Sequence, residues 1–423
     1  MCSAELTQLE SLRCRGGTAA VRDPLSHRLA WWGASAALVA LSLMYSWRVA
    51  PGLPYDEPSH WGYARWVAAH WTLPQIGEPS VGYEAQMGPV GYLISAVVAR
   101  VAAALGASTS MALHGARFAG LLAWGAAATG MFRLIGRCLP QTPRHVAAVG
   151  VAIALANPMV LGMSLSIQND TVALALVIWL MVLVPGNGTR RPLWRAAAIG
   201  GLAGIAVLAK LVVVPAVVVL LLWQCVDKRP RGALRFGVSA AVAVAACGWW
   251  FVRNLVLYGD LTGRSGLHER LGLDFPPLDL PLPAAAVHLT RTAIAYLWLP
   301  GEYYRSTLHA PLILDVLIVL LTVGIVVGGG WAMRGRVCRT TLLLFAVAGV
   351  SILSWAWTAE FQQAVAFRTA YAALPAYGVL VAALSRYVRA PALMATSTVV
   401  LGCVHAWTLI QVSSISYLPG VRL

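Results

Sequence analysis

The sequence predicts an all-α membrane protein whose chain crosses the bilayer many times. Long apolar runs recur along all 423 residues, of which 59% are hydrophobic and only 11% are charged. Soluble proteins carry about 25% charged residues, and an apolar chain of this kind spans a membrane as helices. No segment is polar enough to form a separate soluble domain. We therefore expect a cytoplasmic segment over residues 1–28 and a single integral-membrane domain over 29–423.

The charge of the chain fits a membrane protein better than a nucleic-acid-binding one. There are 31 Lys and Arg against 16 Asp and Glu, a formal charge of +15. Most Arg lie in short loops between apolar runs, where basic residues set the orientation of the spans, so no nucleic-acid partner is expected. The seven Cys are scattered singly, which argues against a zinc site or a disulfide framework.

The positive-inside rule gives an orientation to the first half of the chain. A basic leader puts the N-terminus in the cytoplasm, so the first span, about residues 29–47, runs outward. Three later clusters also mark cytoplasmic loops: Arg133, Arg137 and Arg144; Arg190, Arg191 and Arg195; and Lys228, Arg229, Arg231 and Arg235. The number of membrane crossings from the cytoplasmic N-terminus, through the first span, to the cytoplasmic Arg133–Arg144 cluster must be even if both ends are to face the cytoplasm. An additional span over 89–105 would make that number odd. We therefore expect a long external loop, 48–115, with interfacial helices over 58–71 and 89–105.

The alternative, in which 89–105 crosses the membrane and the following loops change sides, stays open. On the preferred topology there are eleven spans and the C-terminus is outside. After the first span they are expected at 118–134, 146–163, 171–185, two short spans within 196–226 that meet at Lys210, 237–251, 312–330, 341–356, 370–385 and 393–412. A second long external region covers 253–310, where four prolines are expected to break helices: Pro276, Pro277, Pro281 and Pro283.

On this topology, acids and a few cations collect at the outer face. Asp56 and Glu57 stand side by side just after the first span, and His60 follows one turn later. An ionisable group at the centre of a span costs about 2.5–3.5 kcal/mol, so such groups tend to line cavities. A carboxylate can deprotonate a hydroxyl or an amine, and cations can hold a phosphate. The pattern favours a reaction between a polar acceptor and a lipid-linked anion.

Each of these residues also has a structural interpretation. Asp56–Glu57 before a proline suits the start of a helix, and Asn169–Asp170 could cap the helix that follows. Three cations at the ends of spans could instead reach lipid headgroups: Lys210, Arg253 and Arg368.

Six stretches follow one another in a recognisable order. They are Asp56-Glu57-x-x-His60-x-x-Tyr63-Ala64, Tyr83 to Tyr92, Gln168-Asn169-Asp170, Leu208-Ala209-Lys210-Leu211, Trp249 to Asp260, and Phe367 to Pro375. Together they resemble the GT-C superfamily of polyprenyl-phosphate-sugar-dependent glycosyltransferases, which includes protein O-mannosyltransferases and aminoarabinose transferases. The second stretch departs from the family's E-x-x-Q-P-P-L-Y-Y pattern at Met87 and Gly88. The last departs from G-R-Y-x-x-P-x-L-P at Phe367, Thr369 and Ala372.

The resemblance implies a GT-C-type bundle of about 11 transmembrane helices with two interfacial helices in the first external loop. It implies transfer of a sugar, with inversion, from a polyprenyl-phosphate donor to an acceptor at the outer face of the plasma membrane. Asp56 is expected to be the general base, with Glu57 as its catalytic neighbour. The expected substrate-binding residues are His60, Glu84, Gln86, Asn169, Asp170, Lys210, Arg253, Asp260 and Arg368, with the three cations on the phosphate. No cofactor or metal site is expected, although a divalent metal is compatible with the family.

The acceptor is left open among lipid, glycan, protein and natural product, and the sugar among mannose, arabinose and aminoarabinose. The alternative function is a secondary transporter or lipid flippase of the cell envelope. Transporters often show paired repeats, and this sequence shows none. A non-catalytic scaffold for envelope assembly is a third hypothesis.

Overall fold

The computed structural model describes residues 40–41, 43–52, 54, 56–185, 192–226, 232–273, 279–298, 312–335, 337–362, 367–388 and 390–414. The chain divides into two units, Met1–Leu41 and Ser42–Leu423. The expected cytoplasmic segment 1–28 and most of the first span lie outside the described residues, although residues 43–48 are helical. Every regular element in the described ranges is a helix, so the all-α class is confirmed.

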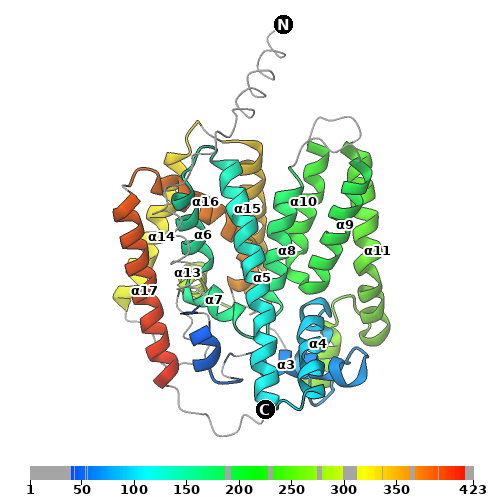
Figure 1. Ribbon diagram of the computed structural model, residues 1–423. Helices are drawn as coiled ribbons and strands as arrows, with labels where there is room; N and C mark the ends of the chain where they lie inside the picture. Colours follow the sequence, from blue (N-terminus) through cyan, green and yellow to red (C-terminus); the bar gives the residue numbers. More distant parts are fainter. Residues whose placement is uncertain are drawn as a thin grey trace. The chain divides into compact units, whose positions relative to one another are not determined.

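The second unit contains the following helices, labelled as in Figure 1: α3 Glu57–His70, η1 Gly82–Gln86, α4 Val90–Ala104, α5 Thr109–Cys138, α6 Arg144–Leu155, α7 Pro158–Ser164, α8 Asp170–Leu183, α9 Pro192–Ala209, η2 Leu211–Val213, α10 Val214–Val226, α11 Gly232–Tyr258, α12 Arg264–Leu271, α13 Leu282–Trp298, α14 Leu312–Ala332, α15 Arg339–Gln362, η3 Phe367–Ala373, α16 Leu374–Ser385 and α17 Ala390–Ser414. Within the described residues, α5, α9, α11 and most of α15 are long and apolar enough to cross a bilayer, and α6 with α7 makes a fifth candidate if the bent pair counts as one span. The number of eleven spans therefore stays a prediction.

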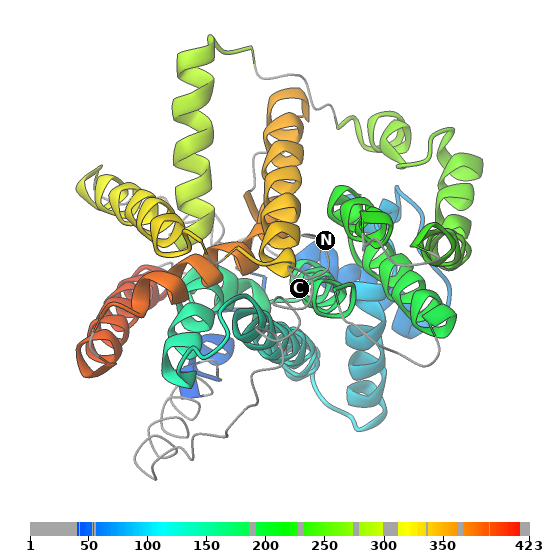
Figure 2. The same cartoon turned by 90° about the horizontal axis from the view of Figure 1, so that it is seen from above.

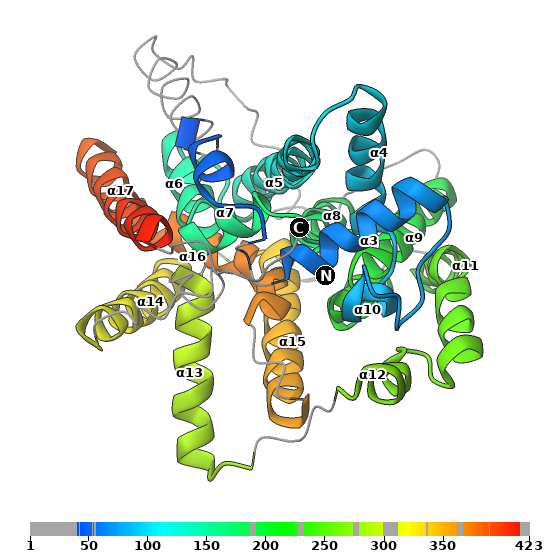
Figure 3. The same cartoon turned by 90° about the horizontal axis from the view of Figure 1, so that it is seen from below.

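Two helices of the first loop lie across the direction of the long helices. Figure 3 shows α3 and α4 lengthwise, whereas Figure 1 shows α5 lengthwise and α3 and α4 at its lower end. Their bounds agree closely with the two interfacial helices expected over 58–71 and 89–105. Pro58 lies in the first turn of α3, where its missing N–H costs no hydrogen bond. The orientation is the one expected of helices that lie in a membrane interface.

The helices α9, α10 and α11 pack as a group of neighbours, which Figure 2 shows together on one side of the view. The expected break between two short helices occurs at Lys210, whose backbone is extended, with φ −159° and ψ 125°. α14 packs on α16, and α17 packs on α6. α8 packs on α9 and α10, and these contacts place the Lys210 break beside the first residues of α8.

The structure modifies two expectations for the helices. The span expected over 146–163 is two helices, α6 and α7, bent by 74°. Asn157 caps α7 by accepting a hydrogen bond from the Val160 N–H at 2.9 Å, and Pro158 cannot donate to the preceding turn. In the region 253–310, Pro281 and Pro283 do not break a helix but flank the start of α13, where a proline is tolerated. Residues 274–278 and 299–311 of that region lie outside the described residues.

Glycines allow backbones to meet around the loop between α7 and α8. A Cβ on Gly120 of α5 would lie 2.2 Å from the carbonyl oxygen of Ser164. A Cβ on Gly91 of α4 would lie 2.6 Å from the Cβ of Asn169. No side chain fits at either position without a shift of the backbone. α4 and α5 are therefore held directly against the segment that leads into α8.

We expect Gly120→Ala to destabilise the protein and Gly125→Ala, five residues along the same helix, to leave it unchanged or more stable. The added methyl at 120 meets a backbone oxygen, whereas nothing lies within 4 Å of a Cβ at 125. Overpacking costs about 1–3 kcal/mol, and Ala is about 1 kcal/mol better than Gly inside a helix. The midpoint of thermal unfolding in detergent measures both effects. Equal midpoints for the two variants would contradict the close packing at Gly120.

Candidate active site

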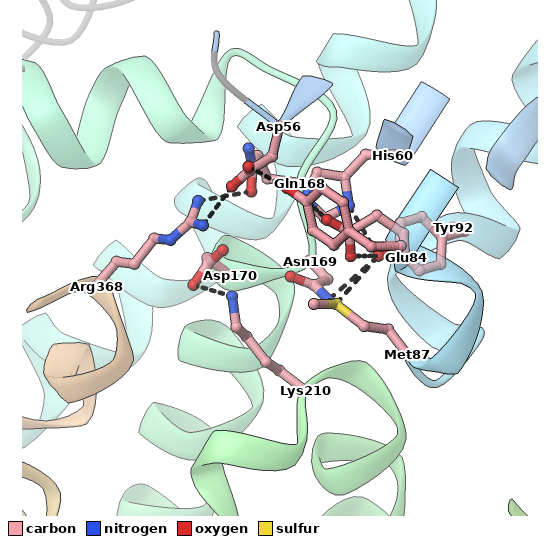
Figure 4. Close-up of polar contacts among 11 residues, drawn as sticks. Asp56, His60, Glu84, Met87, Tyr92, Gln168, Asn169, Asp170, Lys210 and Arg368 are labelled. Carbon is pink, nitrogen blue, oxygen red and sulfur yellow. Dashed lines mark hydrogen bonds and ion pairs between the residues drawn. The ribbon is translucent and has the colours of Figure 1, made fainter. Parts of the chain in front are cut away.

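Side chains from six segments, most of them charged or polar, meet beside the N-terminus of α8 (Figure 4). They come from the start of α3, from η1 and the residue after it, from the first turn of α4, from the loop that leads into α8, from the break between α9 and η2, and from η3. The residues are Asp56, His60, Glu84, Met87, Tyr92, Gln168, Asn169, Asp170, Lys210 and Arg368. Seven of the residues expected at the site from the sequence are therefore brought together.

Asp56 is an ionised carboxylate that faces this cluster. It is 2% exposed; it pairs with Arg368 and accepts a hydrogen bond from the Tyr83 hydroxyl. Burial raises its pKa, but the charge of Arg368, then that of His60, and the hydrogen bonds outweigh burial and lower the pKa to about 2. Asp56 is the residue just before α3, but its side chain does not accept a hydrogen bond from the backbone N–H groups at the start of that helix. Its carboxylate therefore contacts side chains of the cluster and does not cap the helix.

Glu57, the next residue, lies in a different environment. Both of its oxygens bind the guanidinium of Arg117, at 2.8 and 2.6 Å. The same oxygens accept the N–H groups of Gly52 at 2.9 Å and Ile167 at 3.1 Å. A carboxylate has about four acceptor sites, and these four bonds occupy them. The geometry favours a structural role for Glu57, which the sequence predicted as the catalytic neighbour of Asp56.

His60 and Glu84 form a buried pair next to Asp56. The His60 Nε2 lies 3.5 Å from a Glu84 oxygen, and its Nδ1 lies 2.8 Å from the Tyr92 hydroxyl. Burial, followed by the charge of Asp56, raises the pKa of Glu84 to about 8 against the opposing charges of Lys210 and Arg368. Burial lowers the pKa of His60 to about 4. Near neutral pH the two side chains are therefore both uncharged, and both contact the Tyr92 hydroxyl.

Lys210 reaches Asp170, the first residue of α8, with its Nζ 2.6 Å from a carboxylate oxygen. The preceding Asn169 makes no side-chain cap on α8 within the described residues, and its amide nitrogen lies 3.4 Å from the Tyr92 hydroxyl. The Gln168 oxygen lies 3.4 Å from an Arg368 nitrogen, which fixes the direction of its amide because Arg only donates.

Three consecutive residues each bury a polar atom that has no hydrogen-bond partner in the described part of the chain. These atoms are the Gln168 Nε2, the Asn169 Oδ1 and the Asp170 Oδ2. Buried polar groups are nearly always paired. The row therefore offers one donor and two acceptors to a ligand that carries hydroxyl groups.

The remaining three predicted site residues have other contacts. Arg253 donates to the carbonyl of Pro74 at 2.6 Å and stacks over the ring of Trp250. Asp260 accepts hydrogen bonds from Thr262 and Ser265 at the start of α12; although burial raises its pKa, these bonds hold it well below the usual range. Gln86 packs against Gly263. These residues join the turn before α12 to the first loop, and the structure does not bring them into the cluster of Figure 4.

Three further residues of this region were not among the site residues expected from the sequence: Tyr83, Gln168 and Arg117. Gln168 and Tyr83 fall inside motifs that the sequence did single out. Arg117 stands one residue before the expected span 118–134, and an arginine at the edge of an apolar run is a signal that can mark a buried pair.

We expect Glu84 to lower the thermal stability of the protein as the pH rises from about 4.5 to about 8, while His60, whose pKa burial lowers, acts in the opposite sense between about 4 and 6.5. Over this window Glu84→Gln should therefore lose less stability, or gain more, than the native protein. In that window the folded protein keeps a proton on Glu84 that the unfolded chain has released, so rising pH favours unfolding. Glutamine resembles the protonated acid and does not titrate. Unfolding midpoints measured at the two ends of the window test this. The exposed Glu269→Gln is the control and should follow the native protein; an unchanged slope in Glu84→Gln would contradict the protonated state.

No family model and no curated protein matches the chain. Two solved structures are similar in fold: ArnT from Cupriavidus metallidurans bound to undecaprenyl phosphate, and the same protein in the apo state. Both have a TM-score of 0.58, with 16% and 15% sequence identity over 92% and 93% of this chain. The chain spans 66% of the length of each, about two thirds. The protein therefore has the fold of these ArnT structures.

Proposed function

We propose that the protein is an integral-membrane glycosyltransferase that moves a sugar from a polyprenyl-phosphate donor to an acceptor at the outer face of the cytoplasmic membrane. The observation that carries the proposal is the cluster of an ionised Asp56 with the cations Lys210 and Arg368 on this fold. The similar ArnT structure bound to undecaprenyl phosphate supports a polyprenyl phosphate as the lipid partner.

Lys210 and Arg368 are the proposed phosphate contacts. Each is paired with a carboxylate, Asp170 or Asp56, and a donor phosphate would compete for the same N–H groups. Arg binds phosphate oxygens with two parallel hydrogen bonds. The two cations also supply positive charge where the leaving phosphate gains negative charge, so the proposal requires no metal ion.

Asp56 is the proposed general base. When Arg368 turns to the phosphate, Asp56 loses its strongest favourable charge and its pKa rises, which makes it a better proton acceptor. It then takes the proton of the acceptor hydroxyl or amine while that atom attacks the anomeric carbon. The bond from this carbon to the phosphate oxygen breaks, and polyprenyl phosphate leaves with the electron pair. A single displacement of this kind inverts the anomeric configuration.

The row Gln168–Asp170 and the neutral pair of His60 and Glu84 are the proposed contacts for the sugar and the acceptor. Their unpaired atoms suit hydroxyl groups, and the protonated Glu84 can donate a hydrogen bond. The acceptor class and the sugar are left to experiment, with mannose, arabinose and aminoarabinose donors as the first panel.

Asp56→Asn should lower the transfer rate by a factor of about 10²–10⁴, the usual contribution of a general base, while binding of undecaprenyl phosphate is kept or tightened because Arg368 is released. The measurement is transfer of labelled sugar in proteoliposomes from each donor of the panel, with Glu269→Gln as the control. A full transfer rate in Asp56→Asn would remove Asp56 as the base. Uptake of labelled solute without transfer would favour the transporter alternative.

Lys210→Gln and Arg368→Gln should each weaken binding of undecaprenyl phosphate about 10-fold to 100-fold, because a hydrogen bond to a charged group contributes about 1.5–3 kcal/mol. Arg253→Gln is the matched control, since its guanidinium is held by Pro74 and Trp250. Titration of the purified variants with undecaprenyl phosphate gives the dissociation constants. If Arg253→Gln weakens binding as much as the other two, the assignment of the phosphate contacts is wrong.

A further inference from the structure

Arg117 of α5 is fully buried and completely hydrogen-bonded. Its five N–H groups meet five acceptors: both oxygens of Glu57, and the carbonyls of Ser46 at 2.9 Å, Val49 at 2.7 Å and Ala50 at 3.3 Å. A buried charge is tolerated when it is paired and its donors are satisfied. The guanidinium therefore fixes the end of the first helix and the turn that leads to α3.

Glu57 extends this connection to a third part of the chain. One oxygen accepts the Gly52 N–H in the turn before α3, and the other accepts the Ile167 N–H in the loop before α8. Residue 57 follows Asp56 directly, and residue 167 precedes Gln168 directly. The ion pair thus fixes the backbone beside the candidate base and beside the row Gln168–Asp170.

The two proposed phosphate contacts belong to other elements. Lys210 lies at the break between α9 and η2, and Arg368 lies in η3. A substitution at the ion pair should therefore displace Asp56 and the row Gln168–Asp170 more than it displaces Lys210 and Arg368.

We propose that the Glu57–Arg117 ion pair is a positioning device for sugar transfer, which sets Asp56 at the correct distance from the row Gln168–Asp170 without touching the substrate. The inference rests on the proposed function of the site. A displacement of about 1 Å in a reacting group can cost a factor of about 10² in rate, so loss of the pair should act on the chemical step.

Glu57→Gln tests this through the division of its effect between kcat and KM. We expect kcat to fall about 10-fold to 100-fold while KM for the donor changes by less than about 3-fold, with rates expressed per undecaprenyl-phosphate-binding site so that unfolded protein does not count. Arg133→Lys, an exposed arginine on the same helix, is the control and should leave both constants unchanged. A raised KM with unchanged kcat would overturn the inference.

Glu57→Gln leaves a buried guanidinium without its counter-charge, which can prevent folding. Glu57→Asp is the second variant, because it keeps the charge but is one methylene too short to reach every partner; we expect a kcat lowered about 10-fold.

A double variant tests whether Glu57 acts through Asp56. If it does, the double variant Asp56→Asn with Glu57→Asp should be no slower than Asp56→Asn alone, since the base that Glu57 positions is already absent. A further fall of about 10-fold in the double variant would overturn the inference.

Amide hydrogen exchange separates this inference from the proposed function. In Glu57→Asp the amides of Gly52 and of residues 167–170 should exchange faster than in the native protein, and those around Lys210 should not change. Unchanged exchange at 167–170 would overturn the inference. If the exchange follows this pattern but the native protein transfers no sugar from any donor, the proposed function fails and the connection between the two segments stands.

Discussion

The ion pair between Glu57 and Arg117 is the interaction on which the arrangement of the site depends. Taking a charge out of water is costly unless a partner comes with it, and three cations of this region each have their own carboxylate in the described part of the chain. Arg117 pairs with Glu57, Arg368 with Asp56 and Lys210 with Asp170. The first pair has its hydrogen-bonding groups occupied within the protein, whereas the other two border atoms without partners. The Glu57–Arg117 pair therefore has a structural role, whereas the other two pairs lie where a ligand can contact them.

The sequence predicted the all-α class, the two helices of the first loop and seven of the residues that meet in Figure 4. It could do so because apolar runs report helices directly and because acids in a chain with few charges stand out. It could not divide the roles of Asp56 and Glu57. Neighbours in sequence at a helix start point in different directions, and the partner of Glu57 is sixty positions away.

The residues that the sequence misplaced depend on local hydrogen bonds. Asp260 follows a long apolar run of the sequence, as Asp56 does, but the hydroxyl and N–H groups of Thr262 donate hydrogen bonds to it within its own turn. Likewise, Asn157 before Pro158 bends an apolar run that hydropathy alone presents as one span. In both cases a hydrogen bond between residues close in sequence sets the local backbone geometry. The average hydropathy of the surrounding residues does not predict such a bond.

Arg368 cannot give the same N–H groups to Asp56 and to a phosphate. An acceptor that arrives at the empty site meets a carboxylate already engaged by a guanidinium and by the Tyr83 hydroxyl. An acceptor that arrives after the donor meets a carboxylate with an oxygen released. Under the proposed function, the two substrates therefore bind in a compulsory order, donor first, and spent lipid acts as a competitive product inhibitor against the donor. The rate of such an enzyme would follow the supply of lipid-linked sugar rather than the abundance of acceptor.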